Sequence, residues 1–149
     1  MSDNWLRYVP ADPTFLPSPE DAEQARSLLV TFAPMADKVN AVFEDSIVFF
    51  DPGGNWSGVA CQACGKDAKA WWQKAMSASF EGAYENLGLA APCCGAQVSL
   101  NNLRYGSPAA FGRFALEAMN PNIRDLQPEQ EAQLSQALGC ELRKVWVHI

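Results

Sequence analysis

Four of the five cysteines in this 149-residue chain lie in two short clusters, and each cluster ends in glycine. The first is CQACG at positions 61–65, and the second is PCCG at positions 92–95. Paired thiolates in tight turns are the usual ligands of a tetrahedral zinc ion. The pattern predicts one zinc ion bound by Cys61, Cys64, Cys93 and Cys94. Because four protein ligands leave no open coordination position, such an ion would be structural rather than catalytic.

The second cluster departs from the usual spacing. A conventional turn would place its first cysteine at position 91, whereas here Cys93 and Cys94 are adjacent. Adjacent side chains diverge unless the turn is distorted. Cys94, directly before Gly95, is therefore the better placed ligand, and Cys140 near the end of the sequence is an alternative to Cys93.

Two other uses of the cysteines stay open. Val59 and Ala60 favour a strand before the first turn, and a helix follows it, which is also the setting of a thioredoxin-like redox pair. Against this, no βαβ pattern precedes the turn, and a redox pair does not require the second cluster. The remaining alternative is that all five cysteines are reduced side chains that act as small hydrophobic groups.

The net charge of −6 is distributed unevenly. Residues 1–60 contain nine acidic and three basic residues, whereas residues 61–149 contain eight of each. The lack of a basic surface argues against general nucleic-acid binding. Acidic fields instead favour association with cationic surfaces, so we expect a basic protein partner. The nine acids are Asp3, Asp12, Glu20, Asp21, Glu23, Asp37, Glu44, Asp45 and Asp51.

No catalytic residue or organic cofactor is predicted. His148 is the only histidine, and a position at the end of a strand favours a hydrogen-bonded structural role. Glu44, Asp45 and Asp51 could form a carboxylate cluster, but acids around a hairpin are usually solvated. The sequence contains no phosphate-binding loop, nucleophile elbow or dinucleotide fingerprint.

The apolar periodicity predicts a two-layer α+β fold, in which helices pack on a mainly antiparallel sheet. We expect helices over 19–32, 67–87 and 128–138, because Pro19 and Pro128 suit first helical positions and Gly139 suits a C-terminal cap. Residues 1–17 are interpreted as an extended arm. Strands are expected over 39–43 and 47–51, joined by a hairpin at 44–46, and over 56–60, 97–100, 111–118 and 142–149.

These elements suit a single domain over residues 1–149, with zinc-knuckle turns inserted at 61–65 and 92–95. The part from residue 97 contains a strand-helix-strand return that matches half of a ferredoxin-like unit. No apolar run reaches the length of a membrane span, and the first residues do not resemble a signal peptide, so a cytoplasmic location is expected. Clustered cysteines in that compartment favour metal binding over disulfides.

The runs at 92–95, 99–105 and 111–114, together with the segment from Ala137 to His148, resemble a group of small uncharacterised bacterial proteins. The resemblance covers roughly the second half of the chain and the first cysteine turn, and it implies no activity. The two cysteine turns separately resemble zinc-ribbon knuckles, apart from the adjacent cysteines in the second.

The sequence thus favours a non-catalytic, zinc-stabilised interaction protein, with an adaptor or immunity-like role. The alternative is a thiol redox or metal-dependent enzyme that uses the turn from Cys61 to Cys64. The oligomeric state is left open.

Overall fold

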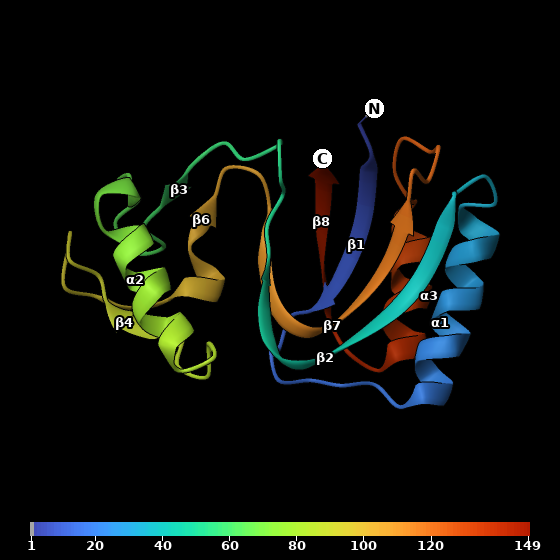
Figure 1. Cartoon of the computed structure of the whole chain (residues 1–149), viewed down its shortest axis with the longest axis horizontal. Coiled ribbons are helices and arrows are strands. Elements are labelled where there is room, and N and C mark those ends of the chain that lie inside the picture. The colour runs from blue at the N-terminus through green and yellow to red at the C-terminus, as the bar shows by residue number, and fades with distance from the viewer. Residues whose placement is uncertain (1) are drawn as a thin grey trace.

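The computed structural model describes residues 2–149 and has a four-stranded antiparallel sheet at its centre (Figure 1). The strand order is β2-β7-β1-β8, and every neighbouring pair is antiparallel. The strands are β1 (Asn4–Pro10), β2 (Lys38–Phe50), β7 (Ala110–Met119) and β8 (Leu142–His148). With three helices in addition, the predicted α+β class is confirmed.

Helices α1 (Pro19–Phe32) and α3 (Pro128–Leu138) have the bounds that their sequence signals predict. The Ser18 hydroxyl accepts a hydrogen bond from the Asp21 backbone N–H (3.1 Å), which caps the first turn of α1. Gly139 ends α3 in the left-handed conformation, with φ of 78°. None of the helices formed by residues 2–149 is long and apolar enough to span a membrane.

Helices α1 and α3 pack together on one face of the sheet, as Figure 1 shows. Alternate residues of β1 and β7 point toward them and form the largest hydrophobic cluster. Its buried members are Leu6, Tyr8, Ala22, Ala25, Leu29, Phe114, Leu116, Ala118, Leu126, Leu134 and Leu138.

The connections β1-α1-β2 and β7-α3-β8 each join two parallel strands with one antiparallel strand between them. Two such split units with this strand order form a ferredoxin-like arrangement. The sequence predicted half of this arrangement, from residue 97. The structure extends it to both halves of the chain.

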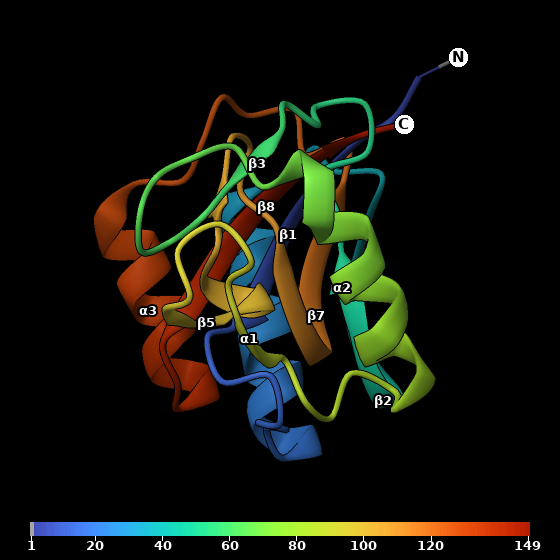
Figure 2. The same cartoon turned by 90° about the vertical axis from the view of Figure 1, so that its left-hand side faces the viewer.

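Residues 51–109, which we call the insertion, lie between β2 and β7 and carry both cysteine clusters. The insertion contains one helix, α2 (Lys69–Glu81), one 3-10 turn and two small sheets (Figure 2). These sheets pair β3 (Val59–Ala60) with β6 (Arg104–Tyr105), and β4 (Gly88–Ala90) with β5 (Gln97–Ser99).

A second hydrophobic cluster joins the insertion to the main sheet. Cys61, Ala68 and Met76 of the insertion belong to it together with Ile47 of β2 and Phe111 of β7. The insertion is thus packed against the sheet from which it emerges.

Helix α2 is shorter than the predicted range of 67–87. Asp67 accepts a hydrogen bond from the Lys69 backbone N–H (2.7 Å) and so lies before the helix. Ala83 and Tyr84 have positive φ values of 54° and 58°, which are incompatible with continuing the helix.

The predicted hairpin at 44–46 is wrong, because residues 38–50 form one strand. Both halves of β2 pair with the same neighbour, with Phe43 opposite Phe114 and Val48 opposite Gly112. The residues between Phe43 and Val48 form a large bulge opposite Arg113. Polar residues that suggested a turn therefore bend the strand instead of reversing it.

The interpretation of residues 1–17 as an extended arm is wrong for residues 4–10, which form β1 in the interior of the sheet. The remaining strands differ from their predicted bounds by one to three residues, and β4 and β6 were not predicted.

Candidate metal centre

The first cysteine turn lies at the end of a short hairpin that starts with β3. The backbone N–H of Cys61 donates to the carbonyl of Lys66 (2.8 Å), and Gly65 N–H donates to the carbonyl of Cys61 (3.0 Å). Gly65 has φ of 76°, a conformation that glycine adopts at little cost. This closed turn presents the side chains of Cys61 and Cys64 on one side.

The second turn, between β4 and β5, repeats this backbone pattern from a residue that is not a cysteine. Ala91 N–H donates to the carbonyl of Ala96 (2.8 Å), and Gly95 N–H donates to the carbonyl of Ala91 (2.7 Å). Gly95 has φ of 75°. Ala91 therefore occupies the position of Cys61, and Cys93 occupies the position of Ala63.

The four sulfur atoms of the two turns lie within 4.8 Å of one another. The Sγ atoms of Cys61 and Cys94 are 3.9 Å apart, and those of Cys64 and Cys93 are 3.4 Å apart. A tetrahedral metal with bonds to sulfur of about 2.3 Å requires sulfur separations of about 3.8 Å. The separations fit a shared metal ion, and they exceed the roughly 2.05 Å of a disulfide bond.

Burial differs among the four cysteines. Cys61 is fully buried in the cluster that joins the insertion to the sheet, whereas Cys64 and Cys94 are exposed. An ion bound here would sit at the surface, anchored through Cys61 to the hydrophobic interior. All four tetrahedral positions would be filled by sulfur, so no position would remain for water or substrate.

The electrostatics of the cluster favour a bound cation. The Cys64 backbone N–H, followed by that of Ala63, donates to the Cys61 sulfur and lowers the pKa of Cys61 to about 6. Burial, reinforced by the sulfurs of Cys64 and Cys61, raises the pKa of Cys93 to about 12. A cation bound between the turns would offset the repulsion that raises the pKa of Cys93.

Two polar side chains hold the turns in place. The Gln62 side-chain carbonyl accepts a hydrogen bond from the Ser99 backbone N–H (3.0 Å), which connects the first turn to β5. The Arg104 guanidinium donates to the Gln62 backbone carbonyl (3.3 Å) from β6. These hydrogen bonds of the protein itself therefore hold the two cysteine turns in position.

Cys140, the alternative fourth ligand, lies elsewhere. It follows α3 and packs against the large hydrophobic cluster, where burial raises its pKa to about 11. The structure thus brings together Cys61, Cys64, Cys93 and Cys94, both adjacent cysteines included, and excludes Cys140 from the group.

The other candidate residues do not assemble into a site. Within residues 2–149, the four cysteines form the only group of three or more potential metal-binding side chains, so Glu44, Asp45 and Asp51 do not form one. His148 ends β8, and its Nδ1 lies 2.8 Å from the Asn4 side-chain oxygen. This is the hydrogen-bonded strand-end position that the sequence favours.

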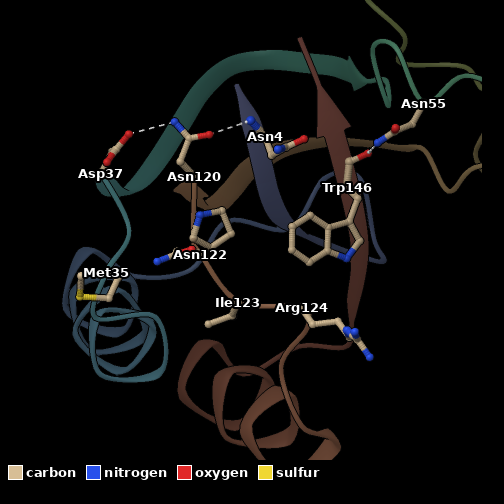
Figure 3. Close-up of a pocket in the computed structure, with 10 residues that line it drawn as sticks. Asn4, Met35, Asp37, Asn55, Asn120, Asn122, Ile123, Arg124 and Trp146 are labelled. Atoms are coloured by element: carbon tan, nitrogen blue, oxygen red, sulfur yellow. Dashed lines mark hydrogen bonds between the residues drawn. The ribbon is translucent and has the colours of Figure 1, made fainter. Parts of the chain in front are cut away.

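The structure also forms a groove of about 690 Å³ at one end of the main sheet (Figure 3). Its side chains come from distant parts of the chain, among them Asn4, Asp37, Asn120 and Trp146. No motif in the sequence indicated it, because each residue is unremarkable alone and only the strand order brings them together.

Comparisons of the chain with protein-family models, with curated proteins and with solved structures gave no match. The resemblance to small bacterial proteins therefore stays a prediction. The likeness to zinc-ribbon knuckles is supported by the geometry of the four sulfurs.

Proposed function

We propose that Cys61, Cys64, Cys93 and Cys94 bind one structural Zn²⁺, and that the protein is a non-catalytic interaction protein of the cytoplasm. The observation that carries the proposal is the mutual approach of four sulfurs within 4.8 Å. Zinc supplies fixed cross-links between two hairpins of the insertion and has no redox chemistry of its own. The metal braces a scaffold, and other surfaces contact the partner.

Metal analysis of the untagged protein tests the first half of the proposal. We expect about one zinc ion per chain, released by a chelator together with free thiols. Replacement by Co²⁺ should give the visible spectrum of tetrahedral sulfur coordination. Iron in place of zinc, or no metal at all, would contradict the assignment.

The expected partner is a basic protein, and the charge of the first sixty residues supports this. Of their nine acids, only Glu23 forms an ion pair within residues 2–149, with Arg26 at 2.7 Å. The other eight keep an uncompensated charge, and most are exposed. Such a surface attracts a cationic partner in an adaptor or immunity-like role, and its affinity should fall with ionic strength.

An affinity pull-down from native cytoplasm at low and high salt tests the partner. Reversal of Glu20, Asp21 and Glu23 to lysine should abolish capture, whereas reversal of Glu81 and Glu85 on the insertion should not. Capture that is indifferent to the first set, or no capture at either salt, would exclude the acidic-surface mechanism.

A thiol redox enzyme is the second candidate, and the 3.4 Å separation of the Cys64 and Cys93 sulfurs favours it. Oxidation would join these sulfurs across the two turns rather than within the Cys61–Cys64 turn. Cys64→Ser distinguishes the candidates, because Cys64 belongs both to the metal group and to the closest sulfur pair. A structural metal site should lose its metal and the order of the insertion, whereas a redox enzyme should lose activity and keep its fold.

A further inference from the structure

The groove at the end of the main sheet is built by four chain segments. The antiparallel strand order brings them to the same end of the sheet. Asn4 begins β1, Asp37 precedes β2, Asn120 follows β7, and Trp146 lies near the end of β8. Together with the α1–β2 and β7–α3 connections they enclose about 690 Å³. This volume is in the range of small-molecule sites.

Asn120 holds the upper wall of the groove in place. Its amide nitrogen donates to Asp37 Oδ2 (2.9 Å) and Asp3 Oδ1 (3.0 Å), and its amide oxygen accepts from the Asn4 backbone N–H (2.9 Å). Figure 3 shows the chain of bonds from Asp37 through Asn120 to Asn4. Since both N–H groups of Asn120 are used, it is a positioning residue.

The neighbouring side chains keep unused hydrogen-bonding atoms. Asn4 accepts at Oδ1 from His148, which leaves its NH₂ group free to donate. Asn55 donates to the Trp146 carbonyl (3.2 Å) and keeps its Oδ1 as an acceptor. Asp37 keeps its second carboxylate oxygen. The wall therefore offers donors and acceptors side by side.

An aromatic ring and a pair of opposite charges complete the lining. The half-buried indole of Trp146 extends into the middle of the groove, with Asp37 on one side and Arg124 on the other (Figure 3). Within residues 2–149, Arg124 takes part in no ion pair. The lining residues thus carry one carboxylate, Asp37, and one guanidinium, Arg124, and a further carboxylate, Asp3, is bonded to Asn120.

We propose that this groove binds a neutral, polyhydroxylated ring, namely a sugar unit of a glycan or a free saccharide. The C–H face of a sugar stacks on an indole, and each hydroxyl both donates and accepts, as the mixed amide wall requires. An apolar ligand would leave the amides without partners. Asp37 would repel a purely anionic ligand, and Arg124 would repel a purely cationic one.

A free amino acid fits less well, although it carries both charges. Its ammonium and carboxylate groups are separated by a single carbon atom, whereas Asp37 and Arg124 lie on opposite sides of the Trp146 ring (Figure 3). The proposal does not depend on the metal or on the acidic surface.

Titration of the ¹⁵N-labelled, metal-loaded protein followed by NMR tests the proposal. The probes are glucose, galactose, N-acetylglucosamine, maltose and cellobiose at millimolar concentrations, with glycine and alanyl-alanine as separate arms. We expect at least one saccharide to shift the Trp146 indole signal and the backbone signals of Asn4 and Arg124. The Trp146 signal is assigned with Trp146→Phe.

Variants of the groove residues test whether the saccharide binds in the groove. Asp37→Asn and Arg124→Ala should each weaken saccharide binding about threefold to tenfold, as expected for one lost hydrogen bond. Asp45→Asn and Lys74→Ala, which change the same charges away from the groove, should leave the affinity unchanged. Trp146→Leu should weaken binding by at least about tenfold. If Trp146→Leu fails to fold, the two charge variants decide.

No shift with any saccharide would overturn the proposal. Shifts in the groove with alanyl-alanine alone would overturn the sugar assignment in favour of a peptide. Saccharide shifts that persist unchanged in both charge variants would place binding outside the groove and would equally overturn it.

Discussion

Cys93 shows how a candidate metal site can depart from the usual cysteine spacing while the backbone of the turn stays the same. The second turn has the hydrogen bonds of the first, yet Ala91 fills the position that Cys61 fills in the first turn. The missing sulfur is supplied two residues later, at the position of Ala63. The side chain of Cys93 must therefore reach the other sulfurs from a different point of the same turn.

This equivalence predicts the outcome of moving the ligand. Cys93→Ala should lose metal, whereas the double variant Ala91→Cys/Cys93→Ala should regain it, because position 91 has the backbone geometry of Cys61. Zinc content measured by elemental analysis on equal amounts of each variant checks this. Failure of the double variant to bind zinc would show that the two turns are not equivalent at the sulfur positions.

Asn120 combines a left-handed backbone, with φ of 46°, and three side-chain hydrogen bonds. Asn120→Ala should lower the free energy of unfolding by about 2–3 kcal/mol, since alanine disfavours this backbone and makes none of the bonds. Asn120→Gly should cost less, about 1–2 kcal/mol, because only the bonds are lost. Denaturant unfolding compares the two. Equal losses would mean that backbone conformation contributes nothing.

At the scale of elements, the bulge of β2 has a polar partner on β7. Arg113 donates to the carbonyls of Glu44 (3.3 Å) and Asp45 (3.0 Å), which the bulge removes from the strand ladder. Arg113→Ala should destabilise the protein by about 1 kcal/mol or somewhat more. Arg113→Lys, which keeps the charge without the fork of donors, should recover only part of this in thermal unfolding. Full recovery by lysine would assign the effect to charge alone.

The elements that the sequence predicted best are those with local signals. Ser18 and Pro19 fix the start of α1, and Pro128 and Gly139 fix the two ends of α3, all through local signals. The bulge of β2 could not be predicted in this way. Whether residues 44–46 reverse the chain depends on β7, which is about seventy residues away.

The difference between local signals and contacts between distant residues also explains why the sequence predicted the cysteine site and not the groove. The cysteine turns could be predicted because each pair is close in sequence and the chemistry of sulfur is specific. Strand β1 was missed because three prolines at positions 10, 13 and 17 suggested an extended arm outside the sheet. The groove could not be predicted, because it forms only when the ends of β1, β2, β7 and β8 lie together at the same end of the sheet.

At the scale of the whole molecule, the candidate metal centre lies in the connection between two neighbouring strands. The insertion leaves the sheet after β2 and returns at β7, and Ile47 and Phe111 at these ends share a hydrophobic cluster with Cys61. A single domain over residues 1–149 stays a prediction. The metal-loaded protein should then unfold in one transition, whichever probe is used.

Removal of the metal should destabilise the insertion more than the main sheet. The strands of the insertion are only two or three residues long, too short to be stable without the metal or extensive packing. After treatment with a chelator, amide hydrogen exchange should accelerate strongly in residues 59–105, whereas β1, β7 and β8 should keep most of their protection. Cys140→Ser is the matched control, because it removes a thiol outside the metal group and should leave the metal content and the exchange of residues 59–105 unchanged. Unaltered exchange in the insertion would show that the metal is not structural, and equal acceleration throughout the main sheet would show that the sheet itself depends on it.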